Sequence, residues 1–301
     1  MHIALIGYGE VGRILAEDLR AAGHGVGAFD VKLPSAAGAA MREHAAAHGV
    51  ALPESHAQAV QGARLVVSAV TASQAVAVAQ ACAPGLAAQA FFLDFNSASP
   101  GAKTRAAEVV NAAGGRYVEG AVMTSVPPYR IRVPLLLGGP DAAALKPLLD
   151  ELGFAAKVHS ETLGVASATK MCRSVMIKGL EAMVIESFTT ARHYGVEDAV
   201  IASLQETFPG IDWEKQAAYF FQRVIEHGRR RSEEVREVAA TVREAGLVPH
   251  SAAGTAERQA HIADLADAGV FGQRGAAGFA RSADWRQEAD RLLGAVKQEG
   301  P

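Results

Sequence analysis

The chain has 301 residues, half of them hydrophobic and a fifth charged, which is typical of a globular protein large enough for two domains. Its 29 basic and 32 acidic residues leave a formal net charge of −3, which gives no reason to expect nucleic acid or an anionic membrane as a partner. Cys82 and Cys172 lie far apart without metal-ligand spacing, so we expect buried, reduced thiols, no metal and a cytoplasmic location.

The first thirty residues combine a strand, a glycine-rich turn, a helix and a second strand. Residues 2–6 form a short apolar run typical of a buried parallel strand, which leaves no room for a signal peptide before it. Residues 7–12 have the spacing G-x-G-x-x-G, and the helical pattern after them ends at Gly23, a residue suited to a helix C-terminus. A second short strand, residues 25–29, stops at Asp30.

Each part of this segment has a physical role in holding a dinucleotide. Gly7 permits the tight turn, Gly9 lets a pyrophosphate approach the backbone, and Gly12 lets the helix pack closely on the strand. The N–H groups at the start of the helix would hold the phosphates. Asp30, 18 residues beyond Gly12, would accept hydrogen bonds from ribose hydroxyls. The segment predicts dinucleotide binding, with a glycine-rich turn of an unrelated α/β unit as the alternative.

Between Asp30 and Gly164 short apolar strands alternate with alanine-rich helices. Strands are expected at residues 64–70, 90–94, 116–122, 133–137 and 154–158, and helices at residues 36–48, 73–82, 101–113 and 141–152. This alternation predicts an α/β fold with a Rossmann-type doubly wound, mostly parallel sheet, whose ligands bind beyond the carboxyl ends of the strands. The candidate site residues at or just after strand ends are Val70, Thr71, Ala72, Asn96, Ser97, Met123, Thr124 and Ser125.

From Gly164 onward the chain shows helical patterns alone. A long helix is expected to run to about Arg192, followed by helices at residues 197–207, 213–227, 232–245, 255–268 and around 285–296. The chain end, Gly300 and Pro301, is expected to fray. We therefore divide the chain into a dinucleotide-binding domain, residues 1–163, and an all-helical domain for substrate binding and dimerisation, residues 164–301.

The long helix carries apolar residues that need a partner surface. Lys178, Glu181 and Glu186 interrupt its apolar stretch, so it is not expected to span a bilayer. An exposed helix with apolar residues on several sides must bury them against something, and a second copy of the helical domain is the natural cover. We expect a homodimer that buries Val175, Ile177, Met183, Val184 and Phe188.

Three motifs give the chain a resemblance to the β-hydroxyacid dehydrogenase superfamily, which includes 6-phosphogluconate and 3-hydroxyisobutyrate dehydrogenases. The first is the glycine loop, followed by A-G-H at residues 22–24 and by Asp30. The second, D-F-N-S-A-S-P at residues 94–100, resembles the family's D-x-S-T-x-x-P segment. The third, G-V-A-S-A-T-K-M-C-R-S at residues 164–174, resembles G-x-G-x-x-x-K-x-x-x-N, and the resemblance implies that Lys170 is the catalytic lysine.

The chain departs from the family pattern at several positions. Ala166 stands at the middle glycine of the third motif, and Ser174 stands at its asparagine. The family's substrate-binding run D-A-P-V-S-G-G is matched loosely by residues 119–125, where Met123 replaces the serine. The substrate identity stays open. The residues expected to contact the substrate are Asn96, Met123, Thr124, Arg173 and Ser174.

Lys170 lies about two turns into its helix, with Arg173 and Ser174 as its i+3 and i+4 neighbours. A lysine there would donate a proton to a carbinol oxygen, or take one from it, as hydride moves from or to a nicotinamide. Arg173 would hold an anionic group of the substrate. The alternative interpretation is a surface lysine on a solvated helix face.

Other charged residues are interpreted as structural. Arg130 and Arg132 would either hold an anion or edge a strand with charge, and we favour the second. The three arginines at 229–231 precede two glutamates and are expected on a solvated helix face. His227 and His250 are expected in loops, and no pattern marks them as catalytic groups or metal ligands.

The predicted function is a nicotinamide-dependent oxidoreductase that interconverts a hydroxyl and a carbonyl on a small, acidic, β-hydroxy-acid-like substrate, with Lys170 as general acid and base. Asp30 favours NAD(H) because it would repel a 2′-phosphate, although nearby Lys32 leaves NADP(H) open. An imine reductase on the same fold and a catalytically silent dinucleotide-binding module are the alternatives. The expected cofactor contacts are Gly7, Tyr8, Gly9, Glu10, Val11, Gly12, Asp30, Val70, Thr71 and Asn96.

Overall fold

The computed structural model describes residues 1–276, 279, 282 and 284–299, so the predicted fraying of Gly300 and Pro301 lies outside the described residues. The chain forms two compact units, Met1–Cys172 and Arg173 onward. The division falls inside one long helix, α7 (Val165–Tyr194), between its eighth and ninth residues. A domain boundary between residues 163 and 164 therefore stays a prediction.

The first unit is built on a seven-stranded sheet in the order β2-β1-β3-β4-β5-β6-β7. Neighbouring strands are parallel except that β6 runs antiparallel to β5. The predicted doubly wound, mostly parallel sheet is confirmed. The strands are β1 (His2–Ile6), β2 (Gly25–Phe29), β3 (Leu65–Ser68), β4 (Phe91–Asp94), β5 (Arg116–Val122), β6 (Leu135–Gly138) and β7 (Ala156–Ser160).

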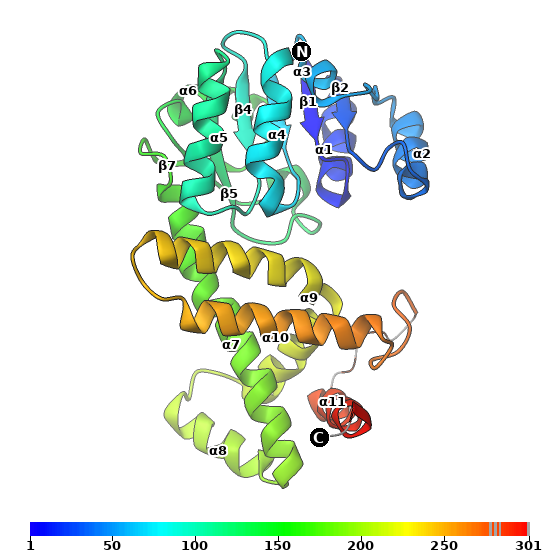
Figure 1. Ribbon diagram of the computed structural model, residues 1–301, viewed down its shortest axis with the longest axis vertical. Coiled ribbons are helices and arrows are strands. Elements are labelled where there is room, and N and C mark those ends of the chain that lie inside the picture. The colour runs from blue at the N-terminus through cyan, green and yellow to red at the C-terminus, as the bar shows by residue number, and fades with distance from the viewer. Residues whose placement is uncertain (277–278, 280–281, 283, 300–301) are drawn as a thin grey trace. The chain divides into compact units, whose positions relative to one another are not determined.

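Helices cover both faces of this sheet because successive side chains of a strand point to opposite sides (Figure 1). On β1, Ile3 and Leu5 pack with residues of α1 and α6, whereas Ala4 and Ile6 pack with residues of α3, α4 and α5. Both faces of the central strands are thus buried, which explains their continuous apolar runs. The helices are α1 (Glu10–Ala21), α2 (Ala39–His48), α3 (His56–Val60), α4 (Ala75–Cys82), α5 (Pro100–Ala112) and α6 (Ala142–Glu151).

The second unit contains helices and no strand within its described residues, as predicted. Besides the later turns of α7, it comprises α8 (Glu197–Thr207), α9 (Trp213–Glu244), α10 (His250–Asp267) and α11 (Trp285–Glu299). Val184 and Phe188 of α7 are buried in its core together with Phe221 and Trp285, so the expectation that a second copy buries these two α7 residues is wrong. No helix of the described chain is long and apolar enough to cross a membrane.

Helix α9 corrects the sequence prediction, which placed two helices at residues 213–227 and 232–245 with His227 in a loop between them. Gly228 stays helical and serves close packing instead, because a Cβ there would lie 2.7 Å from the Gln259 carbonyl oxygen of α10. The prediction failed because a glycine in a helical pattern usually indicates a helix end. Here a glycine is required because α10 packs too closely on α9 to leave room for a side chain.

The continuous helix corrects the interpretation of one of the three arginines at 229–231, since Arg229 and Arg230 lie on a solvated face as predicted and Arg231 does not. Arg231 is only 3% exposed, since residues 224, 228, 231 and 235 share the inward face of α9. Its guanidinium pairs with the buried carboxylate of Glu181, which also accepts a hydrogen bond from Gln259 Nε2 at 3.2 Å. Burial lowers the pKa of Arg231 below its usual value.

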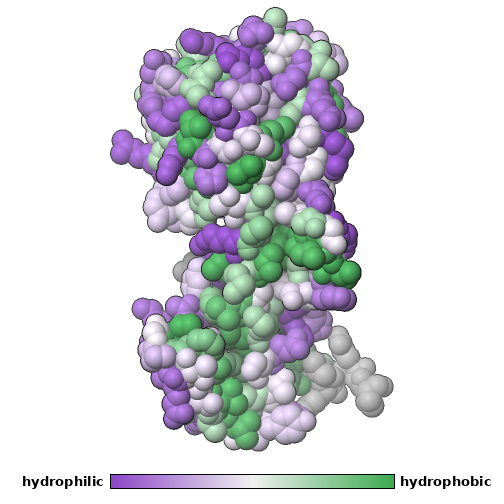
Figure 2. All heavy atoms as spheres, turned by 90° about the vertical axis from the view of Figure 1, so that its left-hand side faces the viewer, coloured by the Kyte–Doolittle hydropathy of each residue, from purple (hydrophilic) through white to green (hydrophobic). Residues whose placement is uncertain are grey.

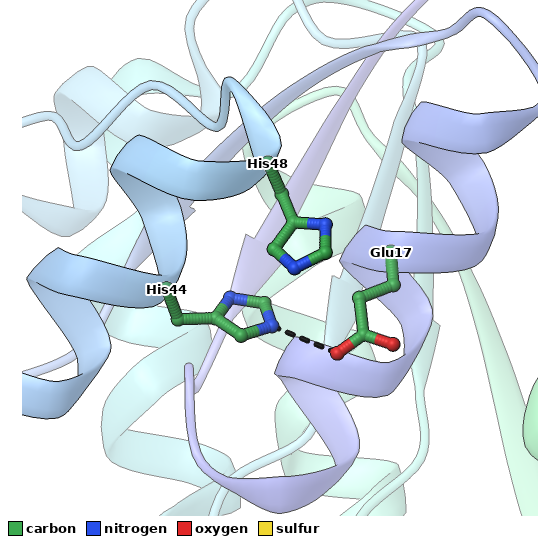
Figure 3. Close-up of side chains that lie close together, drawn as sticks. All are labelled: Glu17, His44 and His48. Carbon is green, nitrogen blue, oxygen red and sulfur yellow. Dashed lines mark hydrogen bonds and ion pairs between the residues drawn. The ribbon is translucent and has the colours of Figure 1, made fainter.

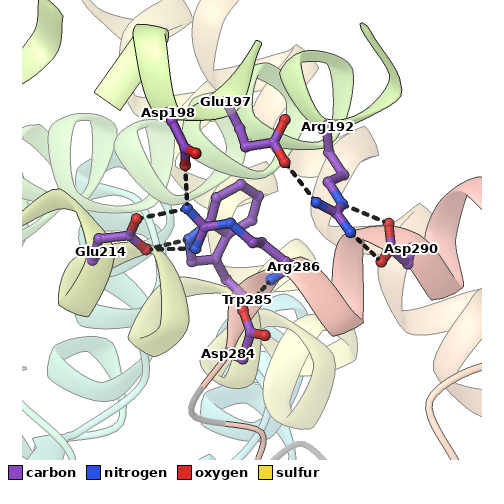
Figure 4. A network of polar contacts seen from close by, with 8 residues as sticks. All are labelled: Arg192, Glu197, Asp198, Glu214, Asp284, Trp285, Arg286 and Asp290. Carbon is purple, nitrogen blue, oxygen red and sulfur yellow. Dashed lines mark hydrogen bonds and ion pairs between the residues drawn. The ribbon is translucent and has the colours of Figure 1, made fainter. Parts of the chain in front are cut away.

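Charged contacts fasten α11 to the other helices of the second unit (Figure 4). Arg286 pairs with Glu214 at 2.8 Å, and Arg192 pairs with Asp290 at 2.8 Å. Trp285 donates from its indole N–H to Glu214 at 2.8 Å and buries the rest of its side chain. Exposed ion pairs contribute at most about 1 kcal/mol each, so burial of the indole is the main contribution to this attachment.

Candidate active site and cofactor site

The glycine loop between β1 and α1 is shaped by close backbone contacts. Gly7 has a φ of +93°, and a Cβ there would lie 2.4 Å from the Ala69 carbonyl oxygen. A Cβ on Gly12 would lie 2.1 Å from the Gly7 carbonyl oxygen. A Cβ on Gly9, by contrast, would meet no described atom within 4 Å. Gly7 and Gly12 therefore serve the fold, and Gly9 keeps the space where a phosphate would approach the start of α1.

Asp30 is held at the carboxyl end of β2, beside this loop. One carboxylate oxygen accepts a hydrogen bond from the Tyr8 amide at 2.9 Å, and the other accepts one from the Lys32 amide at 2.9 Å. The acid is half-buried, so it presents a fixed negative charge at the edge of the loop. Its position, together with the open space at Gly9, fits the adenosine and pyrophosphate parts of a nicotinamide dinucleotide.

Asn96 ties together the ends of β3 and β4. Its side-chain oxygen accepts from the Val70 amide at 2.7 Å, and its side-chain nitrogen donates to the Ser68 hydroxyl at 3.0 Å. Its own amide donates to Asp94 Oδ1 at 2.8 Å. Asn96 is buried, so these contacts fix the two loops in which Val70, Thr71 and Ser97 lie.

Asp94, the last residue of β4, forms a buried ion pair with Lys103. Lys103 Nζ is 3.0 Å from Asp94 Oδ1, and the Tyr117 hydroxyl donates to Asp94 Oδ2 at 2.7 Å. Both charged groups are about 1% exposed. Burial, reinforced by the negative charge of Asp94, raises the pKa of Tyr117 well above its usual value, so the phenol remains a donor. Paired and hydrogen-bonded charges of this kind keep the loop after β4 rigid.

Lys170 and Ser97 are brought together although they are 73 residues apart. The lysine lies half-buried on the second turn of α7, and its ammonium donates to the Ser97 hydroxyl at 2.5 Å. The structure thus joins the second and third sequence motifs at one point. A lysine with a fixed hydroxyl partner is suited to proton transfer at a bound carbonyl or hydroxyl.

Glu119, a residue not singled out from the sequence, anchors the start of α7. This buried β5 carboxylate accepts hydrogen bonds from the amides of Gly164 at 2.9 Å and Ala166 at 3.1 Å, and from the Ser167 hydroxyl at 2.8 Å. Gly138 on the adjacent strand makes room for it, because a Cβ there would lie 2.1 Å from the carboxylate. Glu119 therefore fixes the helix turn that precedes Lys170.

The other predicted site residues lie in varied surroundings. Thr71 and Thr124 are exposed and Met123 is half-buried, all in loops after strand ends. Arg173 is exposed and Ser174 is buried; both belong to the second unit, on the turn of α7 after Lys170.

Arg130 is paired within the first unit. Its guanidinium contacts Asp18 Oδ1 at 2.9 Å through Nε and Glu17 Oε2 at 2.7 Å through a terminal nitrogen. These contacts fit the structural interpretation of Arg130. Of the two histidines expected in loops, His227 lies inside α9 and His250 is the first residue of α10.

The sheet, the glycine loop and Asp30 define a dinucleotide-binding protein of the Rossmann type with a helical second part. A family model described as the NAD binding domain of 6-phosphogluconate dehydrogenase matches residues 2–161, and the chain belongs to this family. A second model, a domain of unknown function (DUF1932), matches residues 191–262. The resemblance to the β-hydroxyacid dehydrogenase superfamily is confirmed.

Proteins of similar sequence or structure match most of the length of this chain. A conserved hypothetical protein from Sinorhizobium meliloti 1021 is 36% identical, and the match covers 98% of this chain and 96% of that chain with a TM-score of 0.76. The 3-hydroxyisobutyrate dehydrogenase of Pseudomonas aeruginosa is 25% identical over 218 residues, 70% of this chain and 71% of its own length. The 3-hydroxyisobutyrate dehydrogenase of Mycobacterium tuberculosis, 18% identical with a TM-score of 0.68 over 97% of this chain and 98% of its own, shares the fold.

Proposed function

We propose that this protein is a nicotinamide-dependent oxidoreductase that interconverts a hydroxyl and a carbonyl on a small, acidic substrate of the β-hydroxy acid type. The observation that carries the proposal is the contact between Lys170 and Ser97, because it joins an ammonium group to the loop that follows β4. The family membership and the open space at Gly9 support the cofactor class.

A nicotinamide dinucleotide bound at the glycine loop and Asp30 would supply the hydride acceptor or donor. In the oxidation, the substrate carbon loses its hydrogen as hydride, and the neutral amine of Lys170 takes the hydroxyl proton. In the reduction, the ammonium of Lys170 donates a proton to the carbonyl oxygen as hydride arrives at carbon. Ser97 orients the Lys170 side chain and the substrate oxygen, since its hydroxyl both accepts and donates hydrogen bonds.

The remaining residues are assigned to binding. Arg173, exposed one turn after Lys170 on α7, would hold the substrate carboxylate, and Ser174 would lie beside it. Met123 and Thr124, in the loop after β5, would contact the rest of the substrate. Because Met123 stands in place of the family's serine, this part of the site would favour an apolar substrate group over one that carries a hydroxyl.

A homodimer is part of the proposal. Met176, Ile177 and Met183 of α7 are 70%, 41% and 60% exposed, whereas Val184 and Phe188 are buried within the second unit. Figure 2 shows hydrophobic side chains at the surface of this unit. A second copy covering the three exposed residues would remove this apolar surface from water. Light scattering at micromolar concentration is expected to give twice the chain mass; a monomer would contradict the dimer.

Initial rates with a substrate panel test the proposed activity. The purified protein is mixed with NAD+ and a series of β-hydroxy acids, and separately with NADH and the matching β-keto acids or cyclic imines, and absorbance of the reduced nicotinamide is followed. We expect turnover of hydroxy and keto acids. Turnover of imines alone would indicate an imine reductase. Tight cofactor binding with no turnover across the panel would indicate a silent binding module.

A further inference from the structure

Three potential metal ligands converge on one side of the first unit, between α1 and α2. Glu17 projects from α1, and His44 and His48 project toward it from α2 (Figure 3). One ligand atom from each residue can be chosen so that all three lie within 4.8 Å of one another. We propose that Glu17, His44 and His48 form a binding site for a divalent transition metal ion of the Zn²⁺ type.

The ligand set and its spacing suit such an ion. His44 and His48 are four residues apart on α2, and their rings stack with centroids 4.4 Å apart and an angle of 27° between the planes. Zn²⁺ binds imidazole nitrogens and carboxylate oxygens at about 2.0–2.2 Å in tetrahedral geometry, which puts ligand atoms about 3.4 Å apart. The three ligand atoms, which lie within 4.8 Å of one another, would have to approach one another to reach that separation. Three protein ligands leave a fourth position for water.

His44 and Glu17 each already have a second hydrogen-bond partner that would orient the side chain toward the ion. The Tyr8 hydroxyl is 2.9 Å from His44 Nδ1, which leaves Nε2 to face Glu17. Arg130 is 2.7 Å from Glu17 Oε2 and leaves Oε1 on the side of the histidines. Metal-binding histidines and carboxylates typically have such second hydrogen-bond partners, which fix their orientation.

His48 distinguishes a metal site from a simple ion pair. His44 Nε2 and Glu17 Oε1 lie 2.8 Å apart, so these two groups are satisfied by each other, and an ion would take the place of their hydrogen bond. His48 has no part in that pair, yet its ring is held against His44. Because His48 is exposed, the site is open to ions from solvent.

The site borders the glycine loop without taking part in the proposed reaction. Tyr8 belongs to the loop, and its amide donates to Asp30. An ion bound by residues of both α1 and α2 would therefore hold α2 against the loop through His44 and Tyr8. Its expected effect is stabilisation of the folded first unit, since a ligand that binds only the folded state shifts unfolding by mass action.

Calorimetric titration of the metal-free, untagged full chain with Zn²⁺ tests the proposal, with Co²⁺ absorbance as a second probe. We expect one ion per chain, intense visible bands from tetrahedral Co²⁺, and a higher melting temperature with Zn²⁺. His48→Ala should weaken binding at least about tenfold. This exposed substitution keeps the contacts of His44 with Glu17 and Tyr8, so the variant is expected to fold.

Two matched variants complete the test. His261→Ala removes an exposed histidine of the second unit, and Cys172→Ser removes the exposed thiol; both should bind Zn²⁺ like the unmodified chain. The proposal is overturned by absence of one-to-one binding, by binding that survives His48→Ala, or by binding lost in either control. None of these readouts uses turnover, so failure here is separate from failure of the proposed oxidoreductase activity.

Discussion

The buried carboxylate of Glu119 accepts a hydrogen bond from the Ser167 hydroxyl at 2.8 Å, which joins the middle of β5 to the first turn of α7. The same carboxylate receives backbone amides of that turn. A negative charge at a helix N-terminus is favourable, and here it is shielded from water. The position of Lys170, three residues beyond Ser167, therefore depends on a residue of the sheet.

Replacing Glu119 with glutamine tests this dependence. The amide keeps the shape but loses the charge and turns a donor toward N–H groups, so Glu119→Gln should lower stability by about 1–3 kcal/mol. It should also lower kcat while leaving cofactor affinity nearly unchanged. Urea denaturation and steady-state kinetics measure both, with the exposed Glu161→Gln as control. A stability loss with normal kcat would show that Glu119 supports the fold without positioning Lys170.

Two of the three loop glycines, Gly9 and Gly12, are expected to behave differently when changed to alanine. Gly12→Ala places a Cβ 2.1 Å from the Gly7 carbonyl oxygen and should destabilise the fold by about 1–3 kcal/mol. Gly9→Ala meets no described atom within 4 Å and should melt near the unmodified temperature, yet weaken NADH binding at least about tenfold. Thermal melts measure the stability of both variants, and fluorescence titration measures their NADH affinity. Normal NADH affinity in Gly9→Ala would argue against a phosphate beside Gly9.

Asp30 is expected to set the cofactor preference. Its fixed carboxylate should favour NADH over NADPH, because a 2′-phosphate would meet a like charge. Asp30→Asn keeps an acceptor oxygen but removes the charge, so the ratio of kcat/KM for the two cofactors should fall toward one. A tenfold or larger preference of the unmodified protein for NADPH would contradict the assignment.

The two cysteines should differ in reactivity and in their effect at alkaline pH. Burial raises the pKa of Cys82 to about 12, whereas the expected burial of Cys172 is wrong, because that thiol is exposed. A thiol reagent at pH 8 should therefore label one thiol in the native chain and two in urea. The raised pKa stabilises the fold fully below about pH 9, and this contribution is lost as pH rises toward 12. Between pH 9 and 10 the unmodified chain should lose about 1 kcal/mol more stability than Cys82→Ala.

Much of the first unit is predictable because its signals are local. The apolar runs, the glycine spacing and Asp30 lie close together in the sequence, and each has a geometric role that few other residue types fill. The contact of Lys170 with Ser97 was foreseeable only through the family motifs, since the two residues are 73 positions apart.

Features that depend on distant neighbours were not predicted. Gly228 led to the prediction of a helix end at residue 227. Its place inside α9 is explained by the close approach of the α10 backbone at Gln259. Glu119 was considered only as part of the run at residues 119–125, and its anchoring of α7 was not predicted because its amide partners are 45 residues or more away. The i,i+4 spacing of His44 and His48 was visible in the sequence, but Glu17, their common neighbour, lies on another helix.

Steady-state and binding measurements on Lys170→Met test the central claim most directly. Without a proton donor and acceptor beside Ser97, kcat should fall by about two to four orders of magnitude. The dissociation constant for NADH should stay nearly unchanged, because the glycine loop and Asp30 are intact. The exposed Lys157→Met serves as control and should keep full activity. If Lys170→Met retains near-normal kcat, the lysine is structural and the proposed proton transfer is wrong.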